Sequence, residues 1–339
     1  MMPRPREYDE SDARVRPSRR GSRPRTKDRP AHLDAVSGTV IAVDRGRYTL
    51  LVQDRTVMAM KARELGRGSV VVGDRVGVVG DVSGADGSLA RIVRIHPRGS
   101  VLRRTADDTD PVERIIVANA DQLAIVCAVA DPTPRPRMID RALVAAYDAG
   151  LTPLLVVTKA DLGDAAQLRA PYAALQVPAV VTARHPHTGE ISGLPALRTV
   201  LRDRVSVFVG HSGVGKSTLV NALVPAADRA IGQVNAVTGR GRHTSTSVVA
   251  LPLTDESGWI IDTPGIRSFG LAHVDPDRFI SHFPDLQLGT QECPRGCHHD
   301  EPECGLDAWV EGGHAGLAGP ARLDSLRRLL RSRAGGPQE

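Results

Sequence analysis

The residues best suited to chemistry form one glycine-rich segment, G-H-S-G-V-G-K-S, at positions 210–217. An apolar run at 205–209 precedes the segment, and a helical pattern follows from Thr218. The spacing fits G-x-x-x-x-G-K-[ST], a loop between a strand and a helix whose backbone N–H groups surround phosphate oxygens. The candidate phosphate contacts are Gly210, His211, Ser212, Gly213, Val214, Gly215, Lys216, Ser217 and Thr218.

Two side chains of this segment have separate expected roles. Lys216 would reach the β- and γ-phosphates of a nucleotide, and the Ser217 hydroxyl would bind Mg²⁺. An ordinary glycine-rich βα turn is the alternative, and it is disfavoured because every spacing and both flanks agree with the motif.

A second motif, Thr158-Lys-Ala-Asp161, follows the apolar run 154–157 and fits [NT]-K-x-D. The Asp161 carboxylate would accept hydrogen bonds from N1–H and the exocyclic amine of guanine, a donor pair that adenine lacks. The Lys159 stem would pack on the base plane. Four residues alone are weak evidence, because a K-x-D after a strand can also be a surface helix cap.

Thr182 and Ala183 also follow an apolar run. Together with Val181 they are the candidate loop whose backbone amide meets the guanine carbonyl. This match is too short to count by itself.

A third motif, Asp262-Thr-Pro-Gly265, follows the strand expected at 259–261 and fits D-x-x-G. Asp262 would lie near Mg²⁺ through a water molecule, and the Gly265 N–H would face the γ-phosphate. Pro and Gly also make ordinary turns. Because three motifs occur together, each strengthens the other two.

The segment G-R-G-R-H-T-S-T at 239–246 lies between the phosphate loop and D-x-x-G. A Thr hydroxyl in such a loop completes the Mg²⁺ shell when the γ-phosphate is bound. Thr244 is the expected ligand, and Thr246 is the alternative.

The order of these motifs is unusual. An ordinary GTPase runs from the phosphate loop through the switch Thr and D-x-x-G to the guanine motif and base loop. Here the guanine motif at 158 and the base loop at 182 precede the phosphate loop at 210. The sequence therefore predicts a circularly permuted P-loop GTPase, with D-x-x-G joined directly to the C-terminal region.

That C-terminal region contains a twelve-residue segment with three cysteines and two adjacent histidines. A Cys₃His set suits one tetrahedral zinc ion, and a reduced, metal-free cluster is the alternative. The expected ligands are Cys293, Cys297 and Cys304 together with either His298 or His299.

Composition limits the class of protein. A length of 339 residues suits two or three domains, and 3% aromatic residues predict aliphatic cores. No apolar run is long enough to cross a membrane and no secretory signal is visible, so we expect a cytoplasmic protein. Disulfides are then improbable, and Cys127, in an apolar strand, is expected to pack in the core.

The net charge of +5 is confined to the first thirty residues, which hold ten Lys and Arg against five Asp and Glu. This Pro-rich segment is expected to be disordered. It would contact nucleic-acid phosphates or serve only as a solubilising tail.

The remaining pattern divides the chain into domains. Five short β-rich runs between 36 and 95 suggest an OB-fold barrel, which binds RNA or acts as a structural adaptor. Residues 98–104 read as a basic linker, after which alternating strands and helices predict a parallel sheet covered on both faces. The predicted multidomain α/β and β architecture is a basic arm at 1–34, the barrel at 35–97, the permuted GTPase domain at 98–275, a zinc-binding helical domain at 276–332 and a tail at 333–339.

This combination resembles the family of ribosome small-subunit-dependent GTPase A over about residues 36–332. The resemblance implies a factor that binds the small ribosomal subunit and its rRNA late in maturation. It also implies weak GTP hydrolysis that the subunit stimulates and that is coupled to release of the factor. Nothing in the sequence suggests more than a monomer. GTP, GDP and Mg²⁺ are the implied ligands, and a membrane partner is not expected.

The resemblance also bears on single residues. Thr158 replaces the more usual Asn, and Ile266 follows D-x-x-G where many GTPases carry a water-positioning Gln. The family suggests His243 for that task. The family's usual knuckle spacing is C-x₄-C-x-H-x₅-C, whereas here three residues separate Cys293 from Cys297. His299 keeps the family's C-x-H step and is the histidine that the resemblance favours, while His298 keeps the distance to Cys304.

Two other functions remain as alternatives. Ile266 leaves open a scaffold that binds GTP without hydrolysing it. An ATPase or small-molecule kinase would keep the phosphate loop, but Asp161 argues against it.

Overall fold

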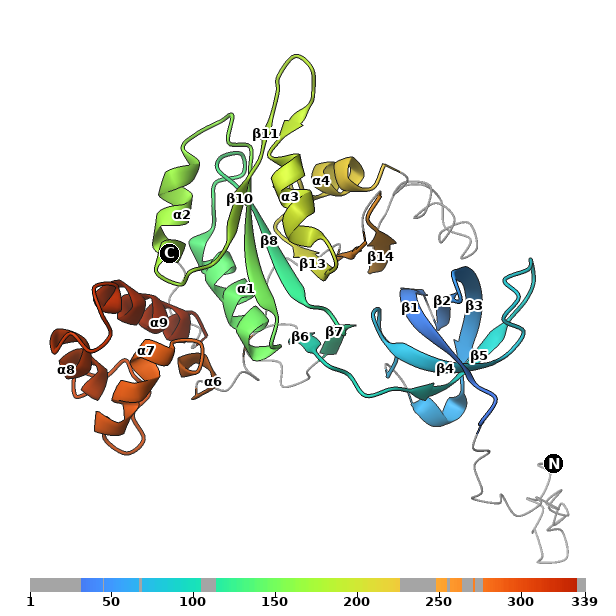
Figure 1. Ribbon diagram of the computed structural model, residues 1–339, viewed down its shortest axis with the longest axis horizontal. Coiled ribbons are helices and arrows are strands. Elements are labelled where there is room, and N and C mark those ends of the chain that lie inside the picture. Colours follow the sequence, from blue (N-terminus) through green and yellow to red (C-terminus); the bar gives the residue numbers. More distant parts are fainter. Residues whose placement is uncertain are drawn as a thin grey trace, which may run out of the picture. The chain divides into compact units, whose positions relative to one another are not determined.

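The structure is a computed structural model that describes residues 32–44, 46–66, 69–104, 114–225, 248–254, 257–263, 271 and 277–333. The chain divides into two compact units, Met1–Leu33 and Asp34–Glu339. The predicted basic arm lies almost wholly outside the described residues, as do the tail and the segment 226–247. Figure 1 shows the elements of the second unit.

Five strands form a closed barrel near the start of this unit. Neighbouring strands pair antiparallel except β3 with β5, which are parallel, and β4 closes the barrel by pairing with β1. Inward side chains such as Leu50 and Ile92 are fully buried, which confirms the predicted OB-like barrel. The strands are β1 (Val36–Asp44), β2 (Arg47–Val52), β3 (Arg55–Lys61), β4 (Arg75–Gly80) and β5 (Ala90–Ile95), with a 3₁₀ turn η2 (Arg63–Leu65).

Six strands form the central sheet in the order β10-β9-β8-β13-β15-β14. All neighbours pair parallel except β14, which runs antiparallel to β15. On its other side β14 pairs antiparallel with β1 of the barrel, where Val249 lies opposite Ala42. Every residue of β8 is buried, as expected for a strand covered on both faces. The strands are β8 (Gln122–Ala128), β9 (Thr152–Thr158), β10 (Ala179–Val181), β13 (Val205–Val209), β14 (Val249–Pro252) and β15 (Trp259–Asp262).

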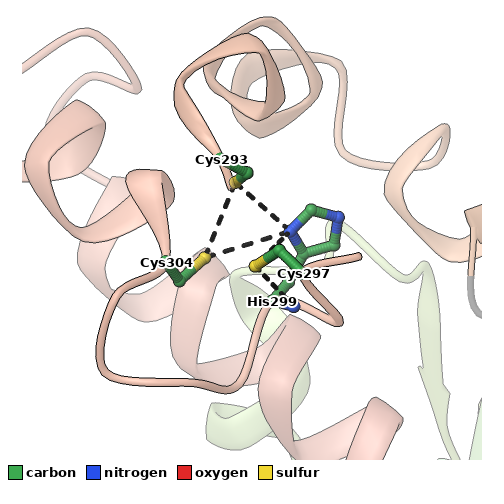
Figure 2. A group of neighbouring side chains, drawn as sticks. All are labelled: Cys293, Cys297, His299 and Cys304. Carbon is green, nitrogen blue, oxygen red and sulfur yellow. Dashed lines mark hydrogen bonds between the residues drawn. The ribbon is translucent and has the colours of Figure 1, made fainter. Parts of the chain in front are cut away.

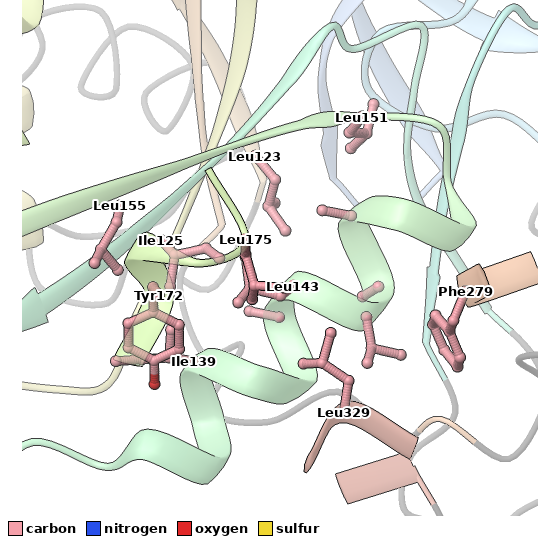
Figure 3. Close-up of a cluster of buried hydrophobic side chains, with 14 of the residues drawn as sticks. Leu123, Ile125, Ile139, Leu143, Leu151, Leu155, Tyr172, Leu175, Phe279 and Leu329 are labelled. Atoms are coloured by element: carbon pink, nitrogen blue, oxygen red, sulfur yellow. The ribbon is translucent and has the colours of Figure 1, made fainter. Parts of the chain in front are cut away.

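Helices cover both faces of this sheet. Leu143 of α1 and Tyr172 of α2 belong to one apolar cluster, drawn in Figure 3, whereas α3 and α4 pack into a second cluster around Phe208. The sheet is therefore the predicted three-layer arrangement. The helices are α1 (Pro136–Asp148), α2 (Ala165–Ala173), α3 (Leu194–Leu201) and α4 (Lys216–Leu223).

The prediction that residues 98–104 form a basic linker is partly wrong. Val101–Arg104 forms strand β6, which pairs antiparallel with β7 (Arg114–Ala118) and buries Leu102. Its partner strand lies about ten residues later, so no alternation in the short basic segment could reveal it. A second small hairpin joins β11 (Ala183–Arg184) to β12 (Ile191–Ser192).

Polar contacts fix the connection between barrel and sheet. Asp74 is fully buried and receives two hydrogen bonds from the Arg98 guanidinium, at 2.6 and 2.8 Å. Asn119 accepts from the Gly99 N–H at 2.8 Å and donates to the Gly73 carbonyl oxygen at 2.9 Å. Because these bonds satisfy buried polar groups, they define the geometry of the connection.

The C-terminal region is helical and packs on α1 and α2 through two arginines of α9. Arg322 is buried, binds Asp285 at 2.7 and 2.8 Å, and donates to the Ala174 carbonyl oxygen at 2.7 Å. Arg328 pairs with buried Asp140 at 3.2 Å. Burial raises the pKa of Asp140 to about 6, and the positive charge of Arg328 opposes that rise. The elements are α6 (Asp277–Ile280), α7 (Pro284–Gln287), the 3₁₀ turn η3 (Leu288–Glu292), α8 (Gly305–Glu311) and α9 (Gly319–Arg333).

Among the helices that the structure describes, none combines the length and the apolar character needed to span a membrane.

Candidate functional site

The predicted nucleotide motifs come together at one edge of the central sheet. The guanine motif follows β9, the base loop follows β10, the phosphate loop follows β13, and Asp262 ends β15. These four strands run in the same direction, so their carboxyl ends share an edge. In an open α/β sheet this edge is where ligands bind.

The phosphate loop has the backbone that its glycines allow. Gly213 and Gly215 have φ values of +85° and +90°, which side chains with a Cβ rarely adopt. Gly210 passes so close to β8 that a Cβ there would lie 2.5 Å from the Val126 carbonyl oxygen. Gly215 is the N-cap of α4, whose first residues are Lys216 and Ser217. The loop is therefore a turn into a helix N-terminus, the arrangement that binds phosphate.

Thr158 joins the guanine motif to this loop. Its Oγ1 donates to the Val214 carbonyl oxygen at 2.6 Å and also lies 3.2 Å from the Cys127 carbonyl oxygen. Thr158 is 4% exposed. Although Thr replaces the more usual Asn here, its hydroxyl still links the guanine motif to the phosphate loop by a hydrogen bond.

Lys216, directly after the phosphate loop, forms an ion pair with Asp262 at the end of β15. Their side chains are 12% and 13% exposed, so the pair is largely shielded from solvent. The neighbouring Thr263 is buried, and its Oγ1 donates to the Phe208 carbonyl oxygen at 2.7 Å. This bond fixes the start of the D-x-x-G segment against the phosphate-loop strand.

The guanine motif carries one exposed carboxylate. Asp161 Oδ1 accepts the Arg184 N–H of β11 at 3.1 Å. The Lys159 ammonium donates to the carbonyl oxygen of Asp131 and lies 3.6 Å from its carboxylate. Asp131 was not singled out from sequence, because it lies in the loop after β8 and carries no motif.

The base loop is tied to the guanine motif by its backbone. The Thr182 N–H donates to the Val157 carbonyl oxygen at 2.7 Å, and the Thr182 carbonyl oxygen accepts the Ala160 N–H at 3.2 Å. Thr182 is 2% exposed, whereas the next residue, Ala183, is half-buried.

The three cysteines and His299 lie together in the C-terminal region, as Figure 2 shows. The Cys293 and Cys304 sulfurs are 3.8 Å apart, and His299 Nδ1 lies 3.6 to 3.9 Å from all three sulfurs. A tetrahedron with Zn–S bonds of about 2.3 Å has S–S edges of about 3.8 Å. The cluster therefore fits one zinc ion.

His298 lies apart from this cluster. Its Nδ1 is 3.0 Å from Glu301 Oε1, and its side chain is 75% exposed. The φ of +68° at His299 turns the chain so that its ring, and not that of His298, faces the thiols.

Helix α9 holds the cysteine loop from outside. Arg327 donates to the His299 carbonyl oxygen at 2.9 Å and binds both oxygens of Asp307, at 2.8 and 2.6 Å. Arg331 binds Asp300 with its closest contact at 2.7 Å. Two bidentate pairs thus orient the histidine and the loop that follows it.

The fourth cysteine has no part in this cluster. Cys127 is 3% exposed within β8, as predicted for a core residue, and burial raises the pKa of its thiol to about 12. It is therefore protonated and unreactive at neutral pH.

Three predicted site residues, His243, Thr244 and Gly265, lie outside the described residues, as do Thr246 and Ile266.

Comparison with protein families gives one description for most of the central region. The model of the RsgA GTPase matches residues 95–272. A protein of Gemmatimonas aurantiaca named small ribosomal subunit biogenesis GTPase RsgA is 40% identical over 264 residues, covering 77% of this chain and 83% of that protein. The equally named protein of Chlorobaculum tepidum is 35% identical over 314 residues, covering 89% and 99%.

Two solved structures share the fold. The crystal structure of YjeQ from Thermotoga maritima superposes with a TM-score of 0.62 at 26% identity, covering 89% of this chain and 99% of that one. YloQ, described as a circularly permuted GTPase, gives a TM-score of 0.60 at 21% identity and covers 92% and 100%. The predicted circular permutation of the GTPase sheet is thereby confirmed.

Proposed function

Because this chain belongs to the RsgA GTPase family, we propose that it hydrolyses GTP on the small ribosomal subunit during late maturation of that subunit. Hydrolysis is stimulated by the subunit and releases the factor. The named relatives supply the partner, and the carrying observation within this chain is that the phosphate loop, Asp161 and Asp262 share one sheet edge. We place the reaction in the cytoplasm, with the protein acting as a monomer.

We assign the chemistry as follows. Backbone amides of residues 210–215 and the Lys216 ammonium bind the phosphates and stabilise charge on the transferred phosphoryl group. Thr218 follows in the first turn of α4. The Ser217 hydroxyl, exposed at the start of that helix, would bind Mg²⁺, and Asp262 would lie near the ion through a water molecule. The ion would add positive charge at the phosphate oxygens. Thr244, Gly265 and His243 keep their predicted roles as switch ligand, γ-phosphate contact and water-positioning group.

We assign the guanine contacts to Thr158, Lys159, Asp161 and the Thr182–Ala183 loop. The C-terminal cluster holds zinc through Cys293, Cys297, His299 and Cys304. Zinc serves structure there, because all four positions are taken by protein ligands.

We further propose the domain limits 1–34, 35–97, 98–275, 276–332 and 333–339 for the arm, barrel, GTPase domain, zinc domain and tail. The arm, barrel and zinc domain supply contacts to rRNA. Binding to the subunit should therefore weaken as salt rises, since each phosphate contact releases counterions.

The first test is GTP turnover by the purified protein alone and with isolated small or large ribosomal subunits. We expect strong stimulation by small subunits and none by large ones. Equal stimulation by both, or by neither, would remove the support for the small subunit as partner.

Asp161→Asn tests the guanine assignment. The amide donates where the carboxylate accepts, so it matches the C2 carbonyl of xanthine better than the guanine amine. We expect GTP affinity to fall by about tenfold or more and the XTP-to-GTP affinity ratio to rise. Competition binding with GTP, XTP and ATP measures both values. Unchanged GTP selectivity would show that Asp161 does not read the base.

A further inference from the structure

The β11–β12 hairpin places one hydroxyl beside the base loop. Ala183 and Ser192 are paired across the hairpin. The Ala183 N–H donates to Ser192 Oγ at 3.2 Å, and the same Oγ lies 3.3 Å from the Ala183 carbonyl oxygen. Ser192 is exposed, as is Asp161 of the guanine motif. Neither the nucleotide motifs nor the roles assigned above use this hydroxyl.

The amide that Ser192 engages belongs to the base loop. The Thr182 N–H already donates to the Val157 carbonyl oxygen at 2.7 Å, and Thr182 is buried. The next residue, Ala183, is paired with Ser192 across the hairpin, and its N–H also donates to the Ser192 hydroxyl oxygen.

The guanine carboxylate lies next to this pair. Asp161 Oδ1 accepts the N–H of Arg184, the residue directly after Ala183. On guanine the N1–H and the C6 carbonyl belong to neighbouring ring atoms. A base whose N1–H reaches Asp161 therefore carries its carbonyl toward the Ala183–Ser192 pair.

From this arrangement, and resting on the proposed GTP-binding function, we propose that Ser192 is a specificity-determining residue that donates its hydroxyl proton to the C6 carbonyl oxygen of guanine. The Ala183 N–H holds the hydroxyl oxygen and polarises its O–H bond. The bond from Ser192 to the Ala183 carbonyl oxygen is long for an O–H donor, so the proton is readily turned to a better acceptor.

The test measures dissociation constants of the full-length protein for three triphosphates. GTP and ITP carry the C6 oxygen, whereas 2-aminopurine riboside triphosphate lacks it. We expect Ser192→Ala to weaken GTP and ITP about three- to tenfold and to leave the 2-aminopurine nucleotide unchanged, since one hydrogen bond is lost. Ser192→Thr keeps the hydroxyl and should restore binding. Thr188→Ala is the matched control, because Thr188 Oγ1 accepts the Glu190 N–H at 3.3 Å within the same hairpin.

Each other outcome counts against the proposal. An equal loss for all three nucleotides would make Ser192 merely structural, and unchanged or tighter GTP binding would mean that the Ala183 N–H reaches the carbonyl directly. Wild-type protein that fails to prefer GTP over ATP would overturn the proposed function together with this inference. Wild-type preference for GTP with no effect at Ser192 would overturn the inference alone.

Discussion

Lys216→Ala is expected to lower subunit-stimulated GTP turnover by about 100-fold or more. Lys216 begins α4 directly after the phosphate loop, where its ammonium can follow the charge that develops on the transferred phosphoryl group. Removing one preorganised transition-state contact of this kind costs about 3 to 4 kcal/mol. Single-turnover hydrolysis with excess small subunits gives the rate without a contribution from product release.

The control must separate lost chemistry from lost folding. Lys216→Ala leaves Asp262, which is 13% exposed, without its ion-pair partner, so the melting temperature has to be measured beside the rate. Asn221→Ala changes an exposed residue of the same helix and should leave turnover unchanged. A folded Lys216→Ala protein with near-normal turnover would exclude Lys216 from the reaction.

Cys304→Ser is expected to abolish stoichiometric zinc and unfold the C-terminal helices. Cys304 is 3% exposed and lies directly before α8, so its ligand bond ties the cysteine loop to a helix. Structural zinc contributes about 10 kcal/mol or more of apparent binding free energy, which a three-ligand site cannot retain. Zinc per chain by mass spectrometry and helix content by circular dichroism measure the two effects.

Two matched variants sharpen this test. His299→Ala should lose zinc, whereas His298→Ala should keep it. The His298 ring contacts the Glu301 carboxylate, and only His299 belongs to the cluster with the three thiols. Cys127→Ala removes a cysteine far from the cluster in sequence and should also keep zinc. Retention of one zinc per chain in both His299→Ala and Cys304→Ser would rule out the cluster as the metal site.

The sequence was most informative where chemistry needs a fixed local spacing. Glycines at 213 and 215 and the lysine at 216 predict the phosphate turn because the backbone cannot form it otherwise. The short β-rich runs of the barrel and the continuous apolar run of β8 predict their strands directly. These signals lie within ten residues, so no knowledge of distant contacts is required.

Contacts between distant segments were not predictable in the same way. Ser192 contacts Ala183 and Asp131 contacts Lys159, yet neither Ser192 nor Asp131 belongs to a sequence motif. Only the fold brings these two residues to their partners. The spacing of the knuckle left two histidines open, because the choice depends on a backbone turn at His299. The strand at 101–104 was missed because only its pairing with β7 makes it regular.

The docking of α9 on α1 also has a consequence for how the chain matures during its own synthesis. Arg141 donates to the Ser332 carbonyl oxygen, 191 residues later in the chain. Asp140 forms its ion pair with Arg328, which is also made near the end of synthesis. At about 5 to 20 residues per second, roughly 10 to 40 seconds pass between the emergence of these partners from the translating ribosome. Throughout that interval α1 exposes the surface that α9 will cover, and the Asp140 carboxyl on that surface has no arginine partner. Helices α1 and α2, which flank the guanine motif, therefore reach their final packing only when the last helix has been made.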